Sequence, residues 1–339
     1  MRKCYAVFIM TAIAMFAFEG CSKGGGEDEI PQPEETYVVS FALTGDVDVS
    51  YEPLTRSTPT NDIYGINVYY DKNKDGNINT VYAYGLFDNI GDMTIPLLSG
   101  YKYKFECSLV KDGKNKLYSG QAFGQSYAGY CYPFQTGTST PTILGNKFVL
   151  GSVKLTGLQS GNAHLKGVTP TTSNYVKMPS IARYYGETTD YVPTKNGKVT
   201  IALKRTVFGA RFIINGIQED GTLSASCGDL WSKTTSQDDE GVETMFSYSD
   251  VYDCWKNESN LTYDVKASYT TIRGEKWDWS ENVTFKRNVM TTVTINVDVD
   301  HYLLYGSIGF SEEPLNGDNY IDLEINGDGI IDTPVDPTN

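Results

Sequence analysis

Histidine is almost absent from this sequence: His164 and His301 are the only two in 339 residues. Hydrolytic triads need a general base beside a nucleophile, and that base is usually a histidine. Neither histidine lies in a recognisable motif, and the GxSxG, HExxH and P-loop patterns do not occur. The many carboxylates show no pattern that identifies a glycosidase pair. We therefore expect no catalytic residues and no enzymatic activity.

Basic residues are also scarce, with 28 Lys and Arg against 42 Asp and Glu and a net charge of −14. Nucleic-acid binding depends on Lys and Arg that neutralise phosphates, so this composition excludes nucleic acid as an expected partner. An anionic membrane surface would repel the chain as well. Attachment to a membrane is therefore expected only through a lipid.

No apolar run is long enough to cross a bilayer, which takes roughly 20 residues. The uncharged run Tyr5–Phe18 follows a basic start and is typical of the h-region of a secretion signal. A cysteine comes soon after it, which favours a lipoprotein signal over residues 1–20 and lipidation of Cys21. The alternative is an ordinary cleaved signal with an unrelated cysteine. Residues 21–36 are rich in Gly, Pro and acidic residues and are expected to form a flexible tether.

The cysteine spacing excludes a zinc site, because no CxxC pair or Cys/His cluster occurs. Of six cysteines, Cys4 leaves with the signal and Cys21 takes the lipid. An even number then remains in an oxidising compartment, which suggests one disulfide in each half of the chain. The expected pairs are Cys107–Cys131 and Cys227–Cys254. Free thiols are the alternative.

Helical periodicity is scarce, whereas alternation with a period of two residues is frequent. Tyr101–Leu109 and the run "TTVTINVDV" both place apolar side chains on one face, as half-buried strands do. Turn dipeptides such as Asn196-Gly197 separate these runs. We predict an all-β fold of two tandem Greek-key, transthyretin-like β-sandwiches over residues 37–196 and 197–339. Further strands are expected at 37–43, 63–70, 81–87, 93–97, 149–155, 199–203, 208–215 and 261–269.

One turn resembles a calcium loop. Asp71, Asn73 and Asp75 stand at alternate positions before Gly76, as in the first half of an EF-hand loop. The twelfth position, where that loop has a bidentate Glu, is Tyr82. Calcium is one interpretation, and a plain hairpin turn between two strands is the other. No other cofactor is expected.

Two of the tryptophans, Trp277 and Trp279, share one face of a predicted strand in "KWDWS". Exposed indole rings at this spacing would stack on sugar rings, whereas buried ones would belong to the core. The core interpretation is favoured, and the exposed one supports an alternative function in glycan binding.

Several motifs occur in a characteristic order. "YVVSFALTG" is followed by "PLTRSTPTNDIYGINVYYDKNKDG", then by "MTIPLLSGYKYKFECSLV", and much later by "MPSIARYYGE" and "GKVTIALKRTVFGARFIING". Together with the lipoprotein start, this order resembles the fimbrillin superfamily, the subunits of type V pili of Bacteroidetes. Acidic residues soon after the lipid cysteine are similar to the surface-export signals of the same bacteria.

The resemblance implies an assembly mechanism. In that family a trypsin-like protease cuts after an arginine in an early loop and removes the first strand, and a terminal strand of the next subunit fills the groove. Carried over to this chain, the cut falls between Arg56 and Ser57 and removes the strand Tyr37–Leu43. Both faces of that strand are largely apolar, which suits a strand inserted between two others better than a strand at the edge of a sheet. The donor strand is expected around Tyr320, Leu323 and Ile325.

We therefore expect a structural subunit of a fimbria, whether stalk, tip or anchor, that takes part in cell adhesion. Its precursor is expected to be lipid-anchored in the outer membrane at the cell surface. Its expected partners are other pilus subunits, in a homo- or hetero-polymer, and a host protein or glycan. The alternative is a surface glycan-binding lipoprotein.

Overall fold

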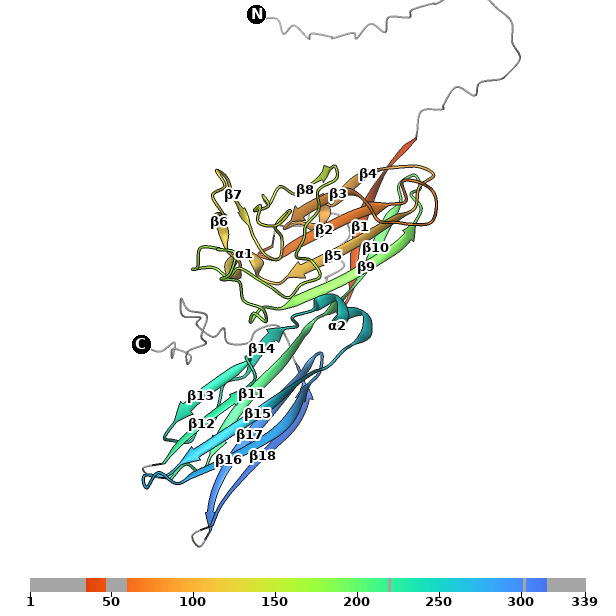
Figure 1. Ribbon diagram of the computed structural model, residues 1–339. Coiled ribbons are helices and arrows are strands. Elements are labelled where there is room, and N and C mark those ends of the chain that lie inside the picture. The colour runs from red at the N-terminus through yellow and green to blue at the C-terminus, as the bar shows by residue number, and fades with distance from the viewer. Residues whose placement is uncertain (1–34, 47–59, 219–220, 301–302, 316–339) are drawn as a thin grey trace, which may run out of the picture. The chain divides into compact units, whose positions relative to one another are not determined.

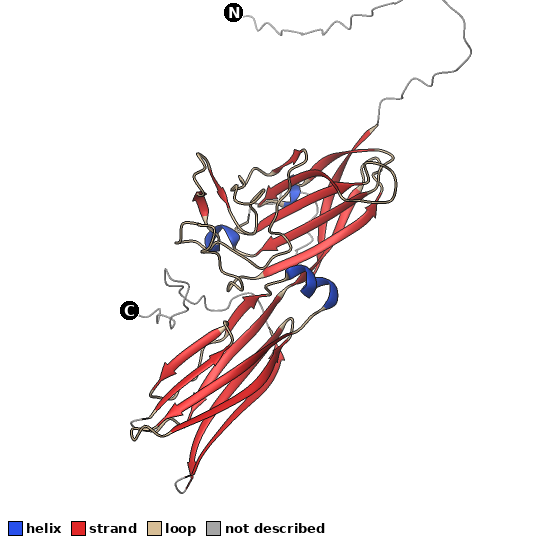
Figure 2. Cartoon of the chain, in the orientation of Figure 1, coloured by secondary structure: helices blue, strands red, loops and turns tan. Residues whose placement is uncertain are grey.

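Strands make up most of the computed structural model, which describes residues 35–46, 60–218, 221–300 and 303–315 (Figures 1 and 2). In those ranges the helices are the 3-10 turn η1 (Ile90–Asp92), α1 (Gly113–Lys116) and α2 (Val251–Asn257). No described helix has the length and apolar character needed to cross a bilayer. The prediction of an all-β fold is confirmed.

The first sandwich is built on one continuous eight-stranded sheet with the order β4-β1-β10-β9-β5-β2-β3-β8. Its strands are β1 (Thr36–Gly45), β2 (Ile63–Tyr70), β3 (Thr80–Phe87), β4 (Thr94–Leu98), β5 (Tyr103–Val110), β8 (Lys147–Leu150), β9 (Arg183–Tyr191) and β10 (Lys198–Arg205). Apolar side chains from β1, β4 and β10 meet those from β2, β3, β5 and β9 in a single core. The alternating pattern of each strand supplies one row of that core.

A long segment between β5 and β9 covers the other side of this sheet. It contains α1, β6 (Ser119–Gln121) and β7 (Ala128–Tyr130), and it forms an apolar cluster of its own around Phe134. A Cβ atom on Gly65 of β2 would lie 2.6 Å from the Phe134 ring, so glycine is needed there for this close packing. As a result, β2 is buried on both faces.

The second sandwich consists of two four-stranded sheets, ordered β14-β11-β17-β18 and β13-β12-β15-β16. Its strands are β11 (Val207–Asn215), β12 (Thr222–Cys227), β13 (Trp231–Thr235), β14 (Thr244–Ser247), β15 (Leu261–Thr270), β16 (Lys276–Phe285), β17 (Val289–Asp300) and β18 (Leu303–Pro314). The inner faces of the two sheets meet in a second core. That core includes Phe212, whose ring stacks on Trp231 at a centroid distance of 4.3 Å.

The two sandwiches share one topology. β1 lies between antiparallel β4 and parallel β10, and β11 lies between antiparallel β14 and parallel β17. In the other layer, the antiparallel series β3-β2-β5-β9 corresponds to β13-β12-β15-β16. The first sandwich adds β8 to this common plan, and the second adds β18.

The position of β10 corrects the predicted division of the chain. A boundary at residue 196 would assign β10 to the second sandwich, but β10 pairs with β1 and β9 in the first. The reason is that Asn196 and Gly197 form the hairpin turn between β9 and β10, with Asn196 at a φ of 57°. The two sandwiches are instead joined at Thr206, between β10 and β11.

His164 lies within the covering segment and is 2% exposed. Its Nδ1 accepts a hydrogen bond from the Tyr132 N–H (3.1 Å), and its Nε2 lies 3.3 Å from the Thr171 carbonyl oxygen. This arrangement requires a neutral ring with the proton on Nε2. Burial lowers the pKa of His164 below its ordinary value of 6.5, although the bond to Thr171 opposes the shift.

Acidification should destabilise this covering segment. Because the folded pKa of His164 lies below 6.5, its stabilising effect is complete above pH 6.5 and is lost as the pH falls below that value. The urea midpoint should therefore fall between about pH 7.5 and about pH 5. His164→Asn keeps an acceptor for the Tyr132 N–H and does not titrate, so its midpoint should fall less. Equal falls in both proteins would contradict this role.

Candidate functional site

The candidate site is the position that β1 occupies in the first sandwich. Residues Ser40 to Gly45 pair in parallel with Lys198 to Leu203 of β10, and Thr36 to Ser40 pair in antiparallel fashion with β4. β1 is therefore an inner strand with a neighbour on each side (Figure 1). β4 pairs with the first half of β1 and β10 with the second half, so removal of β1 would leave β4 without its described neighbour and β10 paired with β9 alone.

Three side chains of β1 enter the first core. Val39, Phe41 and Leu43 are 0%, 6% and 2% exposed. The Phe41 ring meets Phe105 edge-on at 5.4 Å and stacks on Phe148 at 5.5 Å. Offset and edge-on pairs of this kind add to the free energy gained from burial. Phe41 is thus the main apolar anchor of the strand.

The opposite face of β1 is more exposed. The sequence of β1 is apolar on both faces, but Val38 is 61% exposed, and Ser40, Ala42 and Thr44 are only partly buried. Only the face that carries Val39, Phe41 and Leu43 is part of the core. The apolar residues on the other face are mostly small, and none of the described segments buries them as the segment around Phe134 buries β2.

The C-terminal end of β1 is fixed by close contacts of Gly45 and Asp46 with β10. Gly45 has a φ of +101°, and a Cβ atom there would lie 2.2 Å from the Leu203 carbonyl oxygen, so no other residue fits without strain. The next residue, Asp46, donates its N–H to the same carbonyl (2.9 Å). Its Oδ2 accepts from the Arg205 N–H (3.0 Å) and from Arg287 Nη1 (2.8 Å). The chain between residues 46 and 60 then leads to β2.

Several predicted site residues lie outside the described residues. These are the lipidation residue Cys21, the processing residues Arg56 and Ser57, and the donor-strand residues Tyr320, Leu323 and Ile325. The predictions for them stay predictions.

The calcium-like sequence is the turn of the β2–β3 hairpin. Asp71 is 4% exposed, and its two carboxylate oxygens accept from the backbone N–H groups of Asp75 (3.1 Å) and Gly76 (2.7 Å). Asp75 in turn accepts from the Asn77 N–H, and Asn73 lies on the exposed side of the turn. Among the described residues, no group of three or more His, Cys, Asp or Glu is arranged to hold a metal ion. The geometry supports the hairpin interpretation.

The predicted disulfides are not present: Cys107, Cys131, Cys227 and Cys254 are all free and buried. Cys107 points into the first core, whereas Cys131 belongs to the segment on the other side of that sheet. Cys227 and Cys254 lie in the second core, on β12 and α2. Burial raises the pKa of Cys131 to about 11 and those of Cys227 and Cys254 to about 12, which disfavours the thiolate that forms disulfides.

Trp277 and Trp279 pack against the second core and are only partly buried. A Cβ atom on Gly306 of β18 would lie 1.8 Å from the Trp279 indole, so this ring rests on the backbone of β18. The core interpretation therefore describes most of the contacts of these residues, and the glycan-binding alternative, which could also rest on tyrosines, stays untested.

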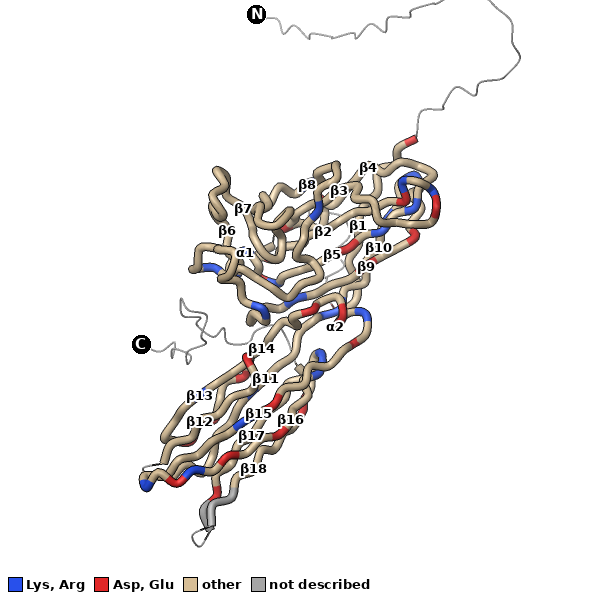
Figure 3. The backbone as a smooth tube through the Cα atoms, in the orientation of Figure 1, with Lys and Arg blue, Asp and Glu red and all other residues tan. Residues whose placement is uncertain are grey.

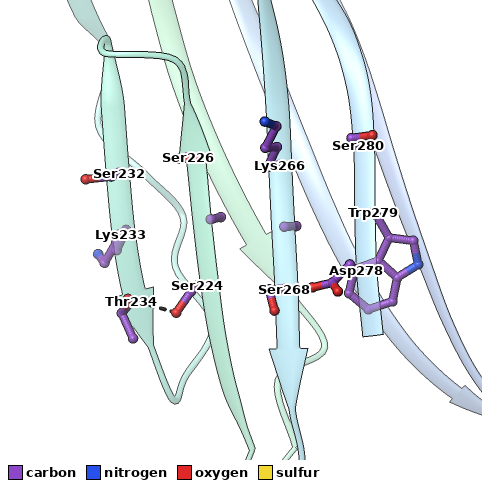
Figure 4. Close-up of a pocket in the computed structure, with 12 residues that line it drawn as sticks. Ser224, Ser226, Ser232, Lys233, Thr234, Lys266, Ser268, Asp278, Trp279 and Ser280 are labelled. Carbon is purple, nitrogen blue, oxygen red and sulfur yellow. Dashed lines mark hydrogen bonds between the residues drawn. The ribbon is translucent and has the colours of Figure 1, made fainter. Parts of the chain in front are cut away.

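The sheet β13-β12-β15-β16 forms a shallow depression, and five of its twelve lining residues are serine (Figure 4). Ser224 is opposite Thr234 on one side and Ser268 on the other, and the Ser224 and Thr234 hydroxyls lie 3.0 Å apart. Lys266 and Asp278 are the charged side chains of this face that Figure 4 shows beside the serines. Figure 3 shows basic and acidic residues interspersed along the described strands, as the overall composition suggests. Small hydroxyl side chains on an exposed sheet face do not by themselves define a ligand.

This chain is similar to solved protein structures, but its sequence matches no family model and no curated protein. A candidate cell adhesion protein from Bacteroides eggerthii covers 83% of this chain and 97% of its own, with 11% identity and a TM-score of 0.34. The fimbrial anchor protein Mfa2 from Porphyromonas gingivalis covers 84% and 99%, with 8% identity and a TM-score of 0.31. A fimbrial assembly protein from Parabacteroides distasonis covers 83% and 100%, with 12% identity and a TM-score of 0.29.

The solved structures to which this chain is similar thus include fimbrial proteins of Bacteroidetes, the group that the sequence motifs predicted. The low identities and TM-scores are no basis for transferring a role. What the chain does is therefore argued from β1 and its surroundings.

Replacing Phe41 should destabilise the first sandwich. Phe41→Ala removes a 6% exposed ring and leaves a cavity beside Phe105 and Phe148, which should lower the free energy of unfolding by about 3–5 kcal/mol. Val38→Ala on the same strand changes a side chain that is 61% exposed and should cost less than about 0.5 kcal/mol. Chemical denaturation of both variants measures the difference, and similar losses would show that β1 is not a core strand.

Proposed function

We propose that this chain is a structural subunit of a surface fimbria, in which β1 is a removable strand that a strand from a neighbouring subunit replaces. The observation that carries the proposal is the position of β1. It is an inner strand with three buried side chains, yet it is the first strand of the fold and the segment after it contains Arg56. A single cut in that segment would separate β1 from every other strand.

Departure of β1 would create a specific groove. β4 lies beside Thr36–Ser40 and β10 lies beside Ser40–Gly45, so the groove would have β4 along one edge of its first half and β10 along the opposite edge of its second half. Backbone groups of β10 that now face six residues of β1, and those of β4 that face five, would lack partners. The floor would be the core around Phe105 and Phe148. An apolar floor between two unpaired edges is a strong template for an incoming strand.

Two segments are candidates for the donor strand: the predicted one at 320–325, and β18. The sequence of β18 favours it, because Gly306, Ile308 and Phe310 alternate with the same spacing as Val39, Phe41 and Leu43 of β1. In that register Glu312 would meet the position of Gly45, where a Cβ atom comes within 2.2 Å of the Leu203 carbonyl oxygen, so the match to β1 ends at Phe310. β18 is also an edge strand, and Phe310 is 56% exposed in its own subunit. A strand with one free edge and an exposed aromatic ring is suited to pair elsewhere.

We further propose that the precursor is held at the outer membrane through lipidated Cys21 and the tether at 21–36. The net charge of −14 disfavours direct binding to an anionic membrane, so the lipid would supply the attachment. Adhesion to a host protein or glycan would then be a property of the assembled fimbria.

Cleavage after Arg56 should convert the monomer into a polymer. Purified protein treated with an arginine-specific protease should begin at Ser57, lose β1 and form polymers, as measured by mass spectrometry and size-exclusion chromatography. Arg56→Gln should stay monomeric under the same treatment. On cells, mass spectrometry of the mature N-terminus should find Ser57 in assembled subunits and diacylated Cys21 in precursors. Cleaved protein that stays monomeric would exclude the stalk role.

Polymerisation should depend on Phe310. Phe310→Ser changes a side chain that is 56% exposed, so the monomer should fold with a midpoint close to that of the wild type. After cleavage it should polymerise at least about tenfold more slowly, because the donor strand would place a hydroxyl in the apolar floor. Ile272→Ser, at a residue that is 74% exposed and lies outside β18, is the matched control. If both variants polymerise like the wild type, the donor is not β18.

A further inference from the structure

The last described residues of the chain are held at the point where β1 ends. Leu315, directly after β18, is 7% exposed and belongs to the first core. Its side chain packs against Gly209, and its N–H donates to the Asn288 carbonyl (2.9 Å). Its own carbonyl accepts from Arg205 Nη1 (3.4 Å). β18 is therefore fixed at its C-terminal end by a buried residue and not only by its pairing with β17.

Arg205 connects this residue to β1. Its side chain is 6% exposed and contacts Leu315 and the Met245 sulfur (3.1 Å). Its backbone N–H donates to Asp46 Oδ2 (3.0 Å), and its carbonyl accepts from Arg287 Nη1 (3.3 Å). The same Arg287 nitrogen donates to Asp46 Oδ2 at 2.8 Å. Asp46 thus holds both the backbone of Arg205 and the side chain of Arg287.

We propose that Asp46 is a latch that couples the presence of β1 to the retention of β18. The latch consists of Asp46, Arg205, Arg287 and Leu315. While β1 is in place, Asp46 fixes the Arg205 backbone, and the Arg205 side chain holds the Leu315 carbonyl. This inference rests on the proposed function, because it gives the removal of β1 a second consequence within the same subunit.

The position of Asp46 in the chain sets the order of events, because β1 has to leave before β18 is released. Asp46 precedes Arg56, so it leaves together with β1. Arg287 would then keep its bond to the Arg205 carbonyl, and Glu258, at 3.7 Å from Arg287 and 2.9 Å from Lys204, would be the carboxylate that both basic side chains share among the described residues. Loss of a charge-assisted bond in a partly buried site loosens the groups that it held. The subunit would release its donor strand only after its own groove has opened.

Hydrogen exchange on the uncleaved full chain tests the latch. Asp46→Asn keeps the shape of the side chain and removes its charge, and should speed exchange of the Leu315 amide roughly 3- to 10-fold. Central β17 amides such as that of Val293 should not change. Glu258→Gln is the matched control, because it contacts Arg287 and Lys204 from outside the removed segment, and it should leave Leu315 unchanged. Coupling is reciprocal, so Leu315→Ala should speed exchange of the Asp46 amide.

The latch is overturned if Asp46→Asn leaves the Leu315 amide unchanged, if Glu258→Gln has an equal effect, or if β17 amides exchange faster to the same extent. Should Asp46→Asn fail to fold, Arg287→Gln breaks the same contact from the second sandwich and carries the same expectation. The proposed function is tested separately, because cleaved wild-type and cleaved Asp46→Asn chains are identical once β1 has left. Cleaved protein can therefore fail to polymerise while hydrogen exchange supports the latch. It can also polymerise while hydrogen exchange excludes the latch.

Discussion

The pairing of β1 with both β4 and β10 is the constraint on which the rest of the structure depends. Burial of Val39, Phe41 and Leu43 contributes roughly 5–9 kcal/mol at about 1.5–3 kcal/mol for each side chain. The whole stability of a domain is usually about 5–15 kcal/mol. A subunit that lost β1 with no replacement would therefore be near the limit of stability. Under the proposed function, exchange would therefore proceed with the incoming strand already bound along part of the groove.

The shared topology of the two sandwiches shows why only one of them is suited to exchange. β11 occupies in the second sandwich the place that β1 has in the first, between an antiparallel and a parallel neighbour. However, β11 follows β10 after Thr206 alone, and it is an internal strand of the chain. A cut beside it would divide the protein into its two sandwiches. The same arrangement of strands thus gives one removable strand and one permanent strand, according to how each is connected.

Local patterns predicted the strands well and their partners poorly. Strict alternation located β5 and β17, and an apolar run with blurred alternation located the strand of the site, Tyr37–Leu43, within β1. The Asn196-Gly197 turn was correctly read as a turn but wrongly as a boundary, because a dipeptide does not show which sheet the next strand will join. The role of Asp46 could not be predicted, since it pairs with Arg287, 241 residues away. The Cys107–Cys131 disulfide was wrongly predicted for a similar reason, because the order of cysteines in the chain does not show which side of a sheet each one faces.

Under the proposed function, one peptide bond decides what a subunit does in a fimbria. An intact chain has its groove filled by its own β1, so it accepts no strand, and it keeps the segment that carries Cys21. Because Asp46 also still holds the end of β18, such a subunit neither accepts nor donates a strand and stays at the membrane. A cleaved chain loses the lipid segment, opens its groove and, through loss of Asp46, frees the end of β18, so that it both accepts and donates. Membrane-bound precursor and stalk subunit would then be two states of the same fold, separated by whether the bond after Arg56 has been cut.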